Sequence, residues 1–183
     1  MNVQPTVLPG VRLIETRVFL DERGHFLEVW REDRYAAAGV EGPFVQDNAS
    51  FSRRGVLRGL HYQHPCAQGK LVSVAAGEVF DVAVDVRRGS PHFGRWVGFV
   101  LSGENGRQLW IPPGFAHGYL TTSEWAVFTY KCTEYYDAGA DRSVAWNDPD
   151  IGVEWPLGNP LLSPKDAAAP KLADLPRDQL PSA

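Results

Sequence analysis

The spacing of turn-forming residues is the feature that most constrains the fold of this chain. Eighteen glycines and 14 prolines are spread through the 183 residues, and they separate short runs rich in β-branched and aromatic side chains. Such punctuation is typical of many short strands and leaves little room for long helices. Because 44% of the residues are hydrophobic, the chain also has enough apolar material for a core. The sequence therefore predicts an all-β protein.

Alternation of apolar and polar residues locates individual strands. In residues 79–86 one face is apolar, whereas the other carries Asp81 and Asp85. Gly77 marks a tight hairpin between this strand and the one before it. Further strands are expected at 26–30, 70–74, 95–101, 107–111, 117–122 and 126–136, and short helices at 31–40 and 163–170. Many short strands at near-regular spacing favour a double-sheet jelly roll or barrel, which can enclose a ligand between its sheets.

Length and composition limit the organisation and the function classes. At roughly 150 residues per domain, we expect one domain over residues 1–183, with its core at about 11–170 and an extended C-terminal tail at 171–183 that wraps the surface or frays. The net charge of −4 argues against a nucleic-acid binder. No segment has the pattern of a signal peptide or a membrane span. The two cysteines match no C-x-x-C spacing, so we expect a reduced, cytoplasmic protein without disulfides or membrane partners.

Histidines are the first candidates for chemistry. His61 and His64 have an H-x-x-H spacing, and His117 follows a Pro-x-Gly turn, which is compatible with a metal site. The first segment lacks an H-x-H pair and a nearby carboxylate, so we expect no metal. A histidine also suits general-base work, because its ordinary pKa is about 6.5. His61 is our candidate, since it shares a dense polar segment with Arg58 and Lys70.

Three further side chains have a functional and a structural interpretation each. Lys70 follows Gly69 at the start of a buried-looking strand, where its ammonium either faces a cavity and stabilises an oxyanion or is simply exposed. The phenol of Tyr130 is either core packing or a proton donor. Asp166 ends a capping-box pattern, Ser-Pro-Lys-Asp, and the same helix start can present its carboxylate to a histidine.

Arginine side chains are the candidates for holding phosphate, because no Gly-rich phosphate loop precedes a helix. Two or three guanidinium groups together can hold a pyrophosphate by paired hydrogen bonds. Arg58 and His61 are three residues apart, so a regular strand would place them on opposite faces. A bulge at Gly59, or a strand that begins after Arg58, would resolve this conflict. The candidates lie in loops or at strand ends: Arg23, Arg53, Arg54 and Arg58.

Taken together, these segments resemble a known family, the dTDP-4-dehydrorhamnose 3,5-epimerases of the cupin superfamily. The matching segments cover most of residues 11–170 in order and without large insertions: FVQDNAS (44–50), GVLRGLHYQ (55–63), QGKLV (68–72), GEVFDVAVDVRRGSPHFGRW (77–96), LWIPPGFAHGYL (109–120), YKCTEYY (130–136), WNDPDIGVEWP (146–156) and LSPKDAAAP (162–170). The resemblance implies a cupin-like jelly roll with a few short peripheral helices. It also implies a homodimer that needs neither metal nor cofactor.

The resemblance further implies an activity and a set of site residues. The activity is inversion of C3 and C5 of dTDP-4-dehydro-6-deoxy-D-glucose to give dTDP-4-dehydro-L-rhamnose, in dTDP-L-rhamnose biosynthesis. By motif, His61 would be the base, Asp166 its orienting partner, Lys70 the group that stabilises the C4 enolate, and Tyr130 the acid on the opposite face. The implied substrate-binding residues are Arg23, Glu28, Gln46, Asn48, Arg58, His117, Tyr136, Asp141 and Lys165. Asp141 stands where members of the family more often have glutamate.

Three alternatives stay open from the sequence. The first is a 5-epimerase or 3-epimerase of a related dTDP-deoxysugar pathway, with the same base and fold but one inversion. The second is a metal-dependent cupin oxygenase or isomerase. The third is a cupin that binds a sugar nucleotide without catalysis. No role is assigned to His64 or Cys66.

Overall fold

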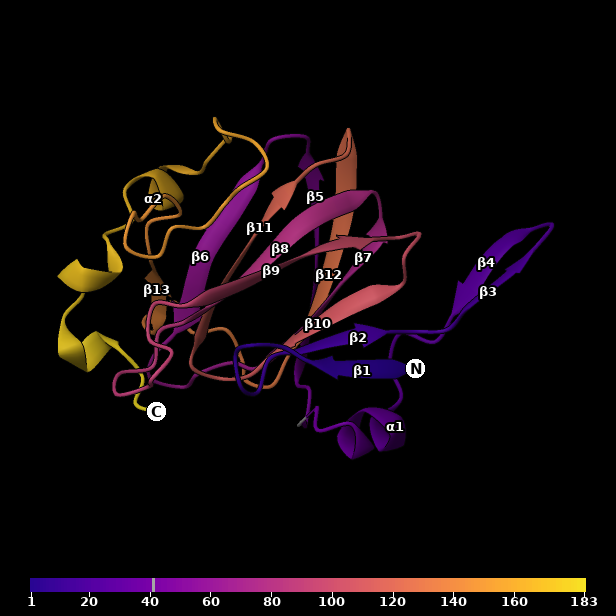
Figure 1. The fold of residues 1–183 in the computed structure, drawn as a ribbon, viewed down its shortest axis with the longest axis horizontal. Helices are drawn as coiled ribbons and strands as arrows, with labels where there is room; N and C mark the ends of the chain where they lie inside the picture. Colours follow the sequence, from indigo (N-terminus) through magenta and orange to yellow (C-terminus); the bar gives the residue numbers. More distant parts are fainter. Residues whose placement is uncertain (41) are drawn as a thin grey trace.

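Two antiparallel sheets face each other and form the body of the protein (Figure 1). The structure is a computed structural model that describes residues 1–40 and 42–183. The six-stranded sheet has the order β1 (Asn2–Pro5), β2 (Arg12–Glu15), β10 (Arg107–Ile111), β7 (Lys70–Ala76), β12 (Trp125–Cys132) and β5 (Gln46–Arg53). The five-stranded sheet has the order β13 (Asp141–Ser143), β6 (Leu57–Gln63), β11 (Phe115–Thr121), β8 (Glu78–Asp85) and β9 (Trp96–Ser102). The predicted all-β double-sheet jelly roll is confirmed.

The main hydrophobic core fills the space between the two sheets. The six-stranded sheet contributes residues such as Val72 and Phe128, and the five-stranded sheet contributes residues such as Ala83, Leu101 and Phe115. This inward face of β8 includes Asp81, whereas its fully apolar outward face packs under the chain that follows β13. Both faces of β8 are therefore buried.

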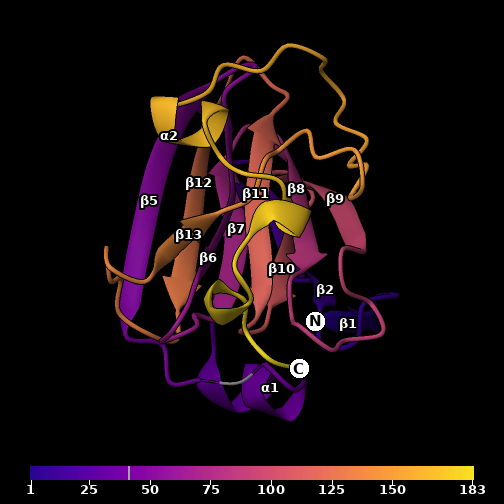
Figure 2. The ribbon, with the colours of Figure 1, turned by 90° about the vertical axis from the view of Figure 1, so that its left-hand side faces the viewer.

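Short helical turns cover the outer faces of the sheets. Helix α1 (Glu32–Ala37) places Tyr35 over the six-stranded sheet, and α2 (Pro164–Ala167) lies beside β6. Both are shorter than predicted. The tail wraps the five-stranded sheet through two 3₁₀ turns, Leu172–Asp174 and Arg177–Gln179, with Leu172 and Leu180 buried (Figure 2). No helix in the described part of the chain is long and apolar enough to cross a membrane.

The predicted hairpin at Gly77 is wrong, although the turn is present. Strands β7 and β8 belong to different sheets, so the chain crosses from one layer to the other at this residue. Gly77 has φ +79°, and a Cβ there would lie 2.1 Å from the carbonyl oxygen of Trp125. Local spacing predicted a tight turn but could not show that its flanking strands pair with other strands.

One element stands away from the body. Among the described residues, strands β3 (Val18–Asp21) and β4 (Gly24–Leu27) pair only with each other, and Figure 1 shows this hairpin projecting from the sheets. The strand predicted at 26–30 ends at Leu27, and the one predicted at 126–136 ends at Cys132.

Candidate active site

A cavity of about 520 Å³ opens between the sheets. Strands β5, β6, β7, β11 and β12 and the segment around α2 contribute to its wall, so segments distant in sequence meet there. The cavity is lined by eight of the predicted site residues: Asn48, Arg58, His61, Lys70, His117, Tyr130, Lys165 and Asp166. Three more, Gln46, Tyr136 and Asp141, line a smaller cavity that shares Lys70 and Tyr130 with the first.

A bulge in β6 allows Arg58 and His61 to reach the same cavity. His61 is paired with His117 on β11, and Arg58 is paired with Tyr119, so three residues of β6 span two of β11. The glycine in this stretch is required, because a Cβ on Gly59 would lie 2.5 Å from the Cα of Gly118. The bulge that the parity argument called for is confirmed.

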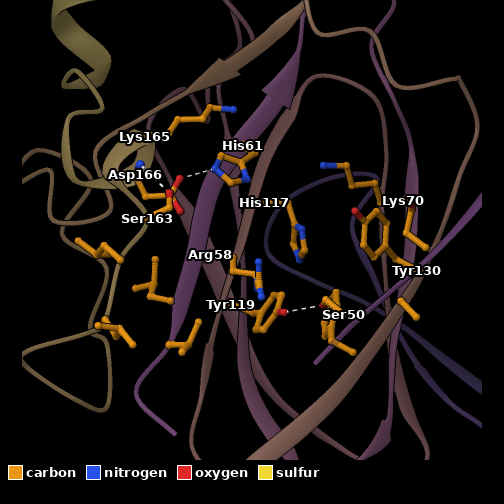
Figure 3. A pocket seen from close by; sticks show the side chains of 17 residues that line it. Ser50, Arg58, His61, Lys70, His117, Tyr119, Tyr130, Ser163, Lys165 and Asp166 are labelled. Atoms are coloured by element: carbon orange, nitrogen blue, oxygen red, sulfur yellow. Dashed lines mark hydrogen bonds and ion pairs between the residues drawn. The ribbon is translucent and has the colours of Figure 1, made fainter. Parts of the chain in front are cut away.

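His61 is hydrogen-bonded to a carboxylate that a helix start presents. Its Nε2 lies 2.5 Å from Oδ1 of Asp166, which is almost fully buried, whereas 31% of the His61 side chain is exposed (Figure 3). Ser163 caps α2 by accepting a hydrogen bond from the backbone N–H of Asp166 at 3.1 Å, and Pro164 is the first helical residue. The predicted cap is therefore present, and the carboxylate it carries also meets a histidine.

The surroundings of Asp166 keep it ionised. Burial works to raise the pKa of its carboxyl group, but hydrogen bonds from His61, Ser163 and the backbone of Gly59, with the charge on His61, together bring that pKa below its usual value. Since Asp166 is then an acceptor, Nε2 of His61 carries the hydrogen, and Nδ1 is the basic nitrogen of the ring.

Lys70 and Tyr130 enter the cavity from the other sheet. Lys70 is the first residue of β7, and Tyr130 lies on the adjacent strand β12 (Figure 3). Loss of hydration on burial lowers the pKa of the Lys70 ammonium, although Asp81 and Asp141 oppose that effect. Burial raises the pKa of the Tyr130 phenol, so this group keeps its proton at neutral pH.

A second histidine of the cavity wall, His117, also pairs with an aspartate, which is buried behind it. Nε2 of His117 is 2.8 Å from Oδ2 of Asp81, a fully buried carboxyl whose Oδ1 has no hydrogen-bond partner among the described residues. Burial raises the pKa of Asp81, and His117 and Lys70 oppose this only in part. Sequence reasoning placed Asp81 on a polar face but could not tell that this face points inward.

The mouth of the smaller cavity is held together by Asp141. Its Oδ2 accepts hydrogen bonds from Lys165 and from the phenol of Tyr136, the latter at 3.1 Å. The charge on Asp141 raises the pKa of Tyr136. Gln46 accepts the backbone N–H of Tyr136 and donates to Asn48. These predicted substrate-binding residues thus form one polar rim.

Two predicted site residues lie elsewhere in this chain. Arg23 is at the tip of the β3–β4 hairpin, where it pairs with Asp21 and its side chain is 89% exposed. Glu28 follows β4 and pairs with Arg34. Neither lines the two cavities, because the hairpin extends away from the sheets. Arg53 and Arg54 also lie outside, so Arg58 is the only one of the four candidate arginines that lines the larger cavity.

Cysteines and metal-ligating groups complete the description of the site. Cys66 is exposed and Cys132 is buried, and both are free thiols. In residues 1–40 and 42–183, no three side chains of the types His, Cys, Asp or Glu converge as a metal site would require.

Comparison with known proteins identifies the family. The family model described as dTDP-4-dehydrorhamnose 3,5-epimerase matches residues 5–174. The chain belongs to this family. It is 55% identical to the dTDP-4-dehydrorhamnose 3,5-epimerase of Salmonella typhimurium, over 94% of this chain and 96% of that protein.

Solved structures agree with this placement. A dTDP-6-deoxy-D-glucose-3,5-epimerase from Legionella pneumophila, in complex with dTDP-4-keto-L-rhamnose, superposes with a TM-score of 0.96 and 53% identity, covering 100% of this chain and 98% of that one. A 3'-monoepimerase from Streptomyces bikiniensis, in complex with dTDP-quinovose, superposes with a TM-score of 0.90 and 36% identity, covering 97% of this chain and 92% of that one. The chain is thus more similar to these double epimerases than to that single epimerase.

Proposed function

We propose that this epimerase inverts C3 and C5 of dTDP-4-dehydro-6-deoxy-D-glucose to give dTDP-4-dehydro-L-rhamnose, within dTDP-L-rhamnose biosynthesis. The observation that carries the proposal is the entry of His61 and Tyr130 into one cavity from opposite sheets (Figure 3). Inversion requires that a proton leaves one face of the sugar ring and returns to the other. A base and an acid on facing walls meet that requirement.

Each proton transfer can be followed through named atoms. Nδ1 of His61 takes the proton from the carbon next to the C4 ketone, and the C–H electron pair becomes an enolate whose charge develops on the C4 oxygen. The Lys70 ammonium lines the cavity, and its partial burial strengthens its interaction with that charge. The Tyr130 hydroxyl then donates its proton to the opposite face. Asp166 stabilises the imidazolium that forms on His61.

Cationic and polar side chains of the two cavities would bind the nucleotide. Arg58 lies at the cavity, and its guanidinium suits the diphosphate of a dTDP-sugar. Lys165, Asn48, Gln46 and His117 supply further donors, while Tyr136 is exposed and can stack on the base. Asp141 holds Tyr136 and Lys165 in place before substrate binds.

We further propose that the active unit is a cytoplasmic homodimer, with residues 1–183 forming one domain per subunit. A two-stranded hairpin is marginally stable alone, yet β3 and β4 pair with no other strand of residues 1–40 and 42–183 and expose Phe19, Leu20 and Phe26. A second copy would cover these side chains. The same contact would deliver Arg23 and Glu28 to the partner's cavity, which explains their distance from the cavity of their own chain.

Subunit mixing tests this arrangement. The variants His61→Ala and Arg23→Ala/Glu28→Ala are each expected to be nearly inactive. A mixed dimer contains one complete site, built from the cavity of the second variant and the hairpin of the first, so mixing should restore up to about half the wild-type activity per mixed dimer. Dimers that exchange subunits without recovering activity would contradict delivery by the partner.

The activity is tested by deuterium incorporation from D₂O into the substrate, with a reductase present to trap the product. We expect deuterium at both C3 and C5 and a product with both centres inverted. Exchange at one carbon alone would establish a single-site epimerase instead. Binding without exchange would indicate a non-catalytic cupin, and loss of activity in EDTA with recovery on adding a metal would indicate a metal-dependent enzyme.

The assignment of Tyr130 has its own test. Tyr130→Phe removes the proposed proton donor but leaves the base and the enolate site intact. Epimerisation should therefore fall at least about tenfold more than solvent exchange does. Equal losses of both rates would mean that Tyr130 does not return the proton.

A further inference from the structure

One wall of the cavity carries a chain of hydrogen bonds that the proposed proton transfers do not use. Nε of Arg58 donates to Oγ of Ser52 at 3.1 Å, and the hydroxyl of Tyr119 lies 3.2 Å from Ser52 and 2.8 Å from Ser50. Tyr119 and Ser52 are almost fully buried, and Tyr119 lines the cavity together with Ser50. Figure 3 shows the Tyr119 hydroxyl directed across the cavity wall at Ser50.

The Arg58 end of this chain has a fixed direction. The Arg58 Nε–H can only donate, so the Ser52 hydroxyl accepts it. In the contacts of Tyr119 with Ser52 and Ser50 either hydroxyl can be the donor, and the contact with Ser52 links the phenol to the guanidinium. Since the series starts at a cation, its first bond polarises the Ser52 hydroxyl.

Tyr119 is held rigidly enough to anchor such a chain. It lies on β11 in the five-stranded sheet, but it reaches Ser50 and Ser52 on β5 in the six-stranded sheet. Its ring stacks on Phe128, with centroids 4.1 Å apart. It is also the register partner of Arg58 across the bulge in β6. The phenol therefore ties the two sheets together beside the guanidinium.

The positive charge of the Arg58 guanidinium is not neutralised by a carboxylate of the described residues, so it is available to a ligand. Its hydrogen-bond partners among the described residues are the Ser52 hydroxyl and the backbone carbonyl of Phe51, both neutral. No carboxylate in that part of the chain pairs with it, although several other arginines are paired. Neutral anchors fix the direction of the group without cancelling its charge, and unused N–H donors remain for a ligand.

We propose that Tyr119 is a positioning residue that acts through Ser52 and fixes the Arg58 guanidinium for the diphosphate of the nucleotide sugar. This inference rests on the proposed function. It assigns Tyr119 to affinity rather than to proton transfer, because its hydroxyl is engaged by two serines and is not free to reach the sugar ring.

Tyr119→Phe tests the proposal, since it removes the hydroxyl and keeps the stacked ring. We expect the dissociation constant for dTDP, measured by calorimetry, and the KM for the sugar nucleotide to rise about fivefold to tenfold, with kcat within about twofold of wild type. Ser52→Ala should give a similar change. In an Arg58→Ala background, adding Tyr119→Phe should weaken dTDP binding by less than about twofold, because the positioned group is already absent.

A matched control separates positioning from stability. Tyr62→Phe also removes a buried phenol hydroxyl, which donates to the backbone of Gln179 on the outer face of the five-stranded sheet. It should leave dTDP binding unchanged even if it lowers the melting temperature. Should Tyr119→Phe fail to fold, Ser52→Ala alone and in the Arg58→Ala background provides the same comparison.

Two outcomes would overturn the inference. One is wild-type affinity for dTDP in folded Tyr119→Phe and Ser52→Ala. The other is a full, additive loss on top of Arg58→Ala. Failure of the proposed function is a different result, because the wild-type protein would then neither bind dTDP nor exchange substrate protons.

Discussion

Both His61 and His117 line the larger cavity, and each joins its Nε2 to a carboxyl oxygen, of Asp166 at 2.5 Å and of Asp81 at 2.8 Å. They differ in how the carboxylate is held. Asp166 sits at a capped helix start, and its pKa is lowered by the donors around it. Asp81 sits in the middle of β8 with one oxygen unpaired among the described residues, and burial raises its pKa. Hydrogen-bond distance alone would not distinguish them.

This difference assigns different work to the two histidines. A partner that stays ionised can stabilise an imidazolium, so His61 can gain and release a proton during each turnover. A partner that resists ionisation cannot do this as well, so His117 is suited to holding a fixed hydrogen-bonding state toward the substrate. The following variants test that division of roles.

The largest effect is expected for His61→Ala. Loss of the base should lower kcat and the rate of solvent exchange about 10²-fold to 10⁴-fold, while the affinity for dTDP stays within about twofold. His117→Ala is the matched variant, and it should raise KM more than it lowers kcat. If both histidine variants lost equal kcat, the two pairs would share the same role.

The next largest difference is expected between the kcat values of the two aspartate variants. Asp166→Asn removes the charge that stabilises the His61 imidazolium, so we expect kcat to fall about 10²-fold. Asp81→Asn should lower kcat by about tenfold or less, because Asp81 contacts His117 rather than the proposed base His61. The measurement is kcat for both variants at saturating substrate. A larger loss for Asp81→Asn would reverse the assignment.

Stability should depend on pH with opposite signs at the two carboxyl groups. An aspartate in the unfolded chain has a pKa of about 3.9. The pKa of Asp166, which faces His61, is lower when folded, so its contribution to stability is present above that pH and is lost as the pH falls through the lowered value. The pKa of Asp81, which faces His117 and Lys70, is raised, so its burial costs stability increasingly as the pH rises above about 3.9.

Urea unfolding between about pH 3 and pH 7 measures both trends. Relative to wild type, Asp166→Asn should be destabilised at neutral pH and less so in acid. Asp81→Asn should gain relative stability in the free energy of unfolding as the pH rises. Parallel curves for the two variants would show that the carboxyl groups titrate alike.

The smallest effect concerns the cap that holds Asp166. Ser163→Ala should lower the free energy of unfolding by about 0.5–1 kcal/mol and reduce kcat a few-fold, since Asp166 is then held less firmly. Calorimetric unfolding and steady-state kinetics give the two values. Unchanged kcat would show that His61 alone suffices to position Asp166.

Much of the fold could be predicted because strands and turns have local sequence patterns. The period of two in residues 79–86, the turns rich in glycine and proline, and the Ser-Pro-Lys-Asp cap are all present as expected. The hairpin at Gly77 was wrong because the turn is local, whereas strand pairing is not. Helix lengths were overestimated because the short apolar runs at 31–40 and 163–170 continue into loop rather than helix.

Prediction of the site residues likewise succeeded for local signals and failed for distant contacts. Residue type and motif selected His61, Lys70, Tyr130 and Asp166, and the structure places all four at one cavity. Asp81, Tyr119 and the serines of β5 were missed, since their importance comes from partners distant along the chain.

Amino-acid order was sufficient for the all-β class and for the helix start at Asp166, because each depends on residues within a few positions of one another. It also showed the parity conflict between Arg58 and His61, but only the register of β6 with β11 resolved that conflict as a bulge. The pairing of that aspartate with a histidine 105 residues away, the inward direction of Asp81, and the contrast in pKa between the two carboxyl groups came from packing. Burial and hydrogen-bond partners set a side chain's electrostatics, and both arise only when the two sheets close over the cavity.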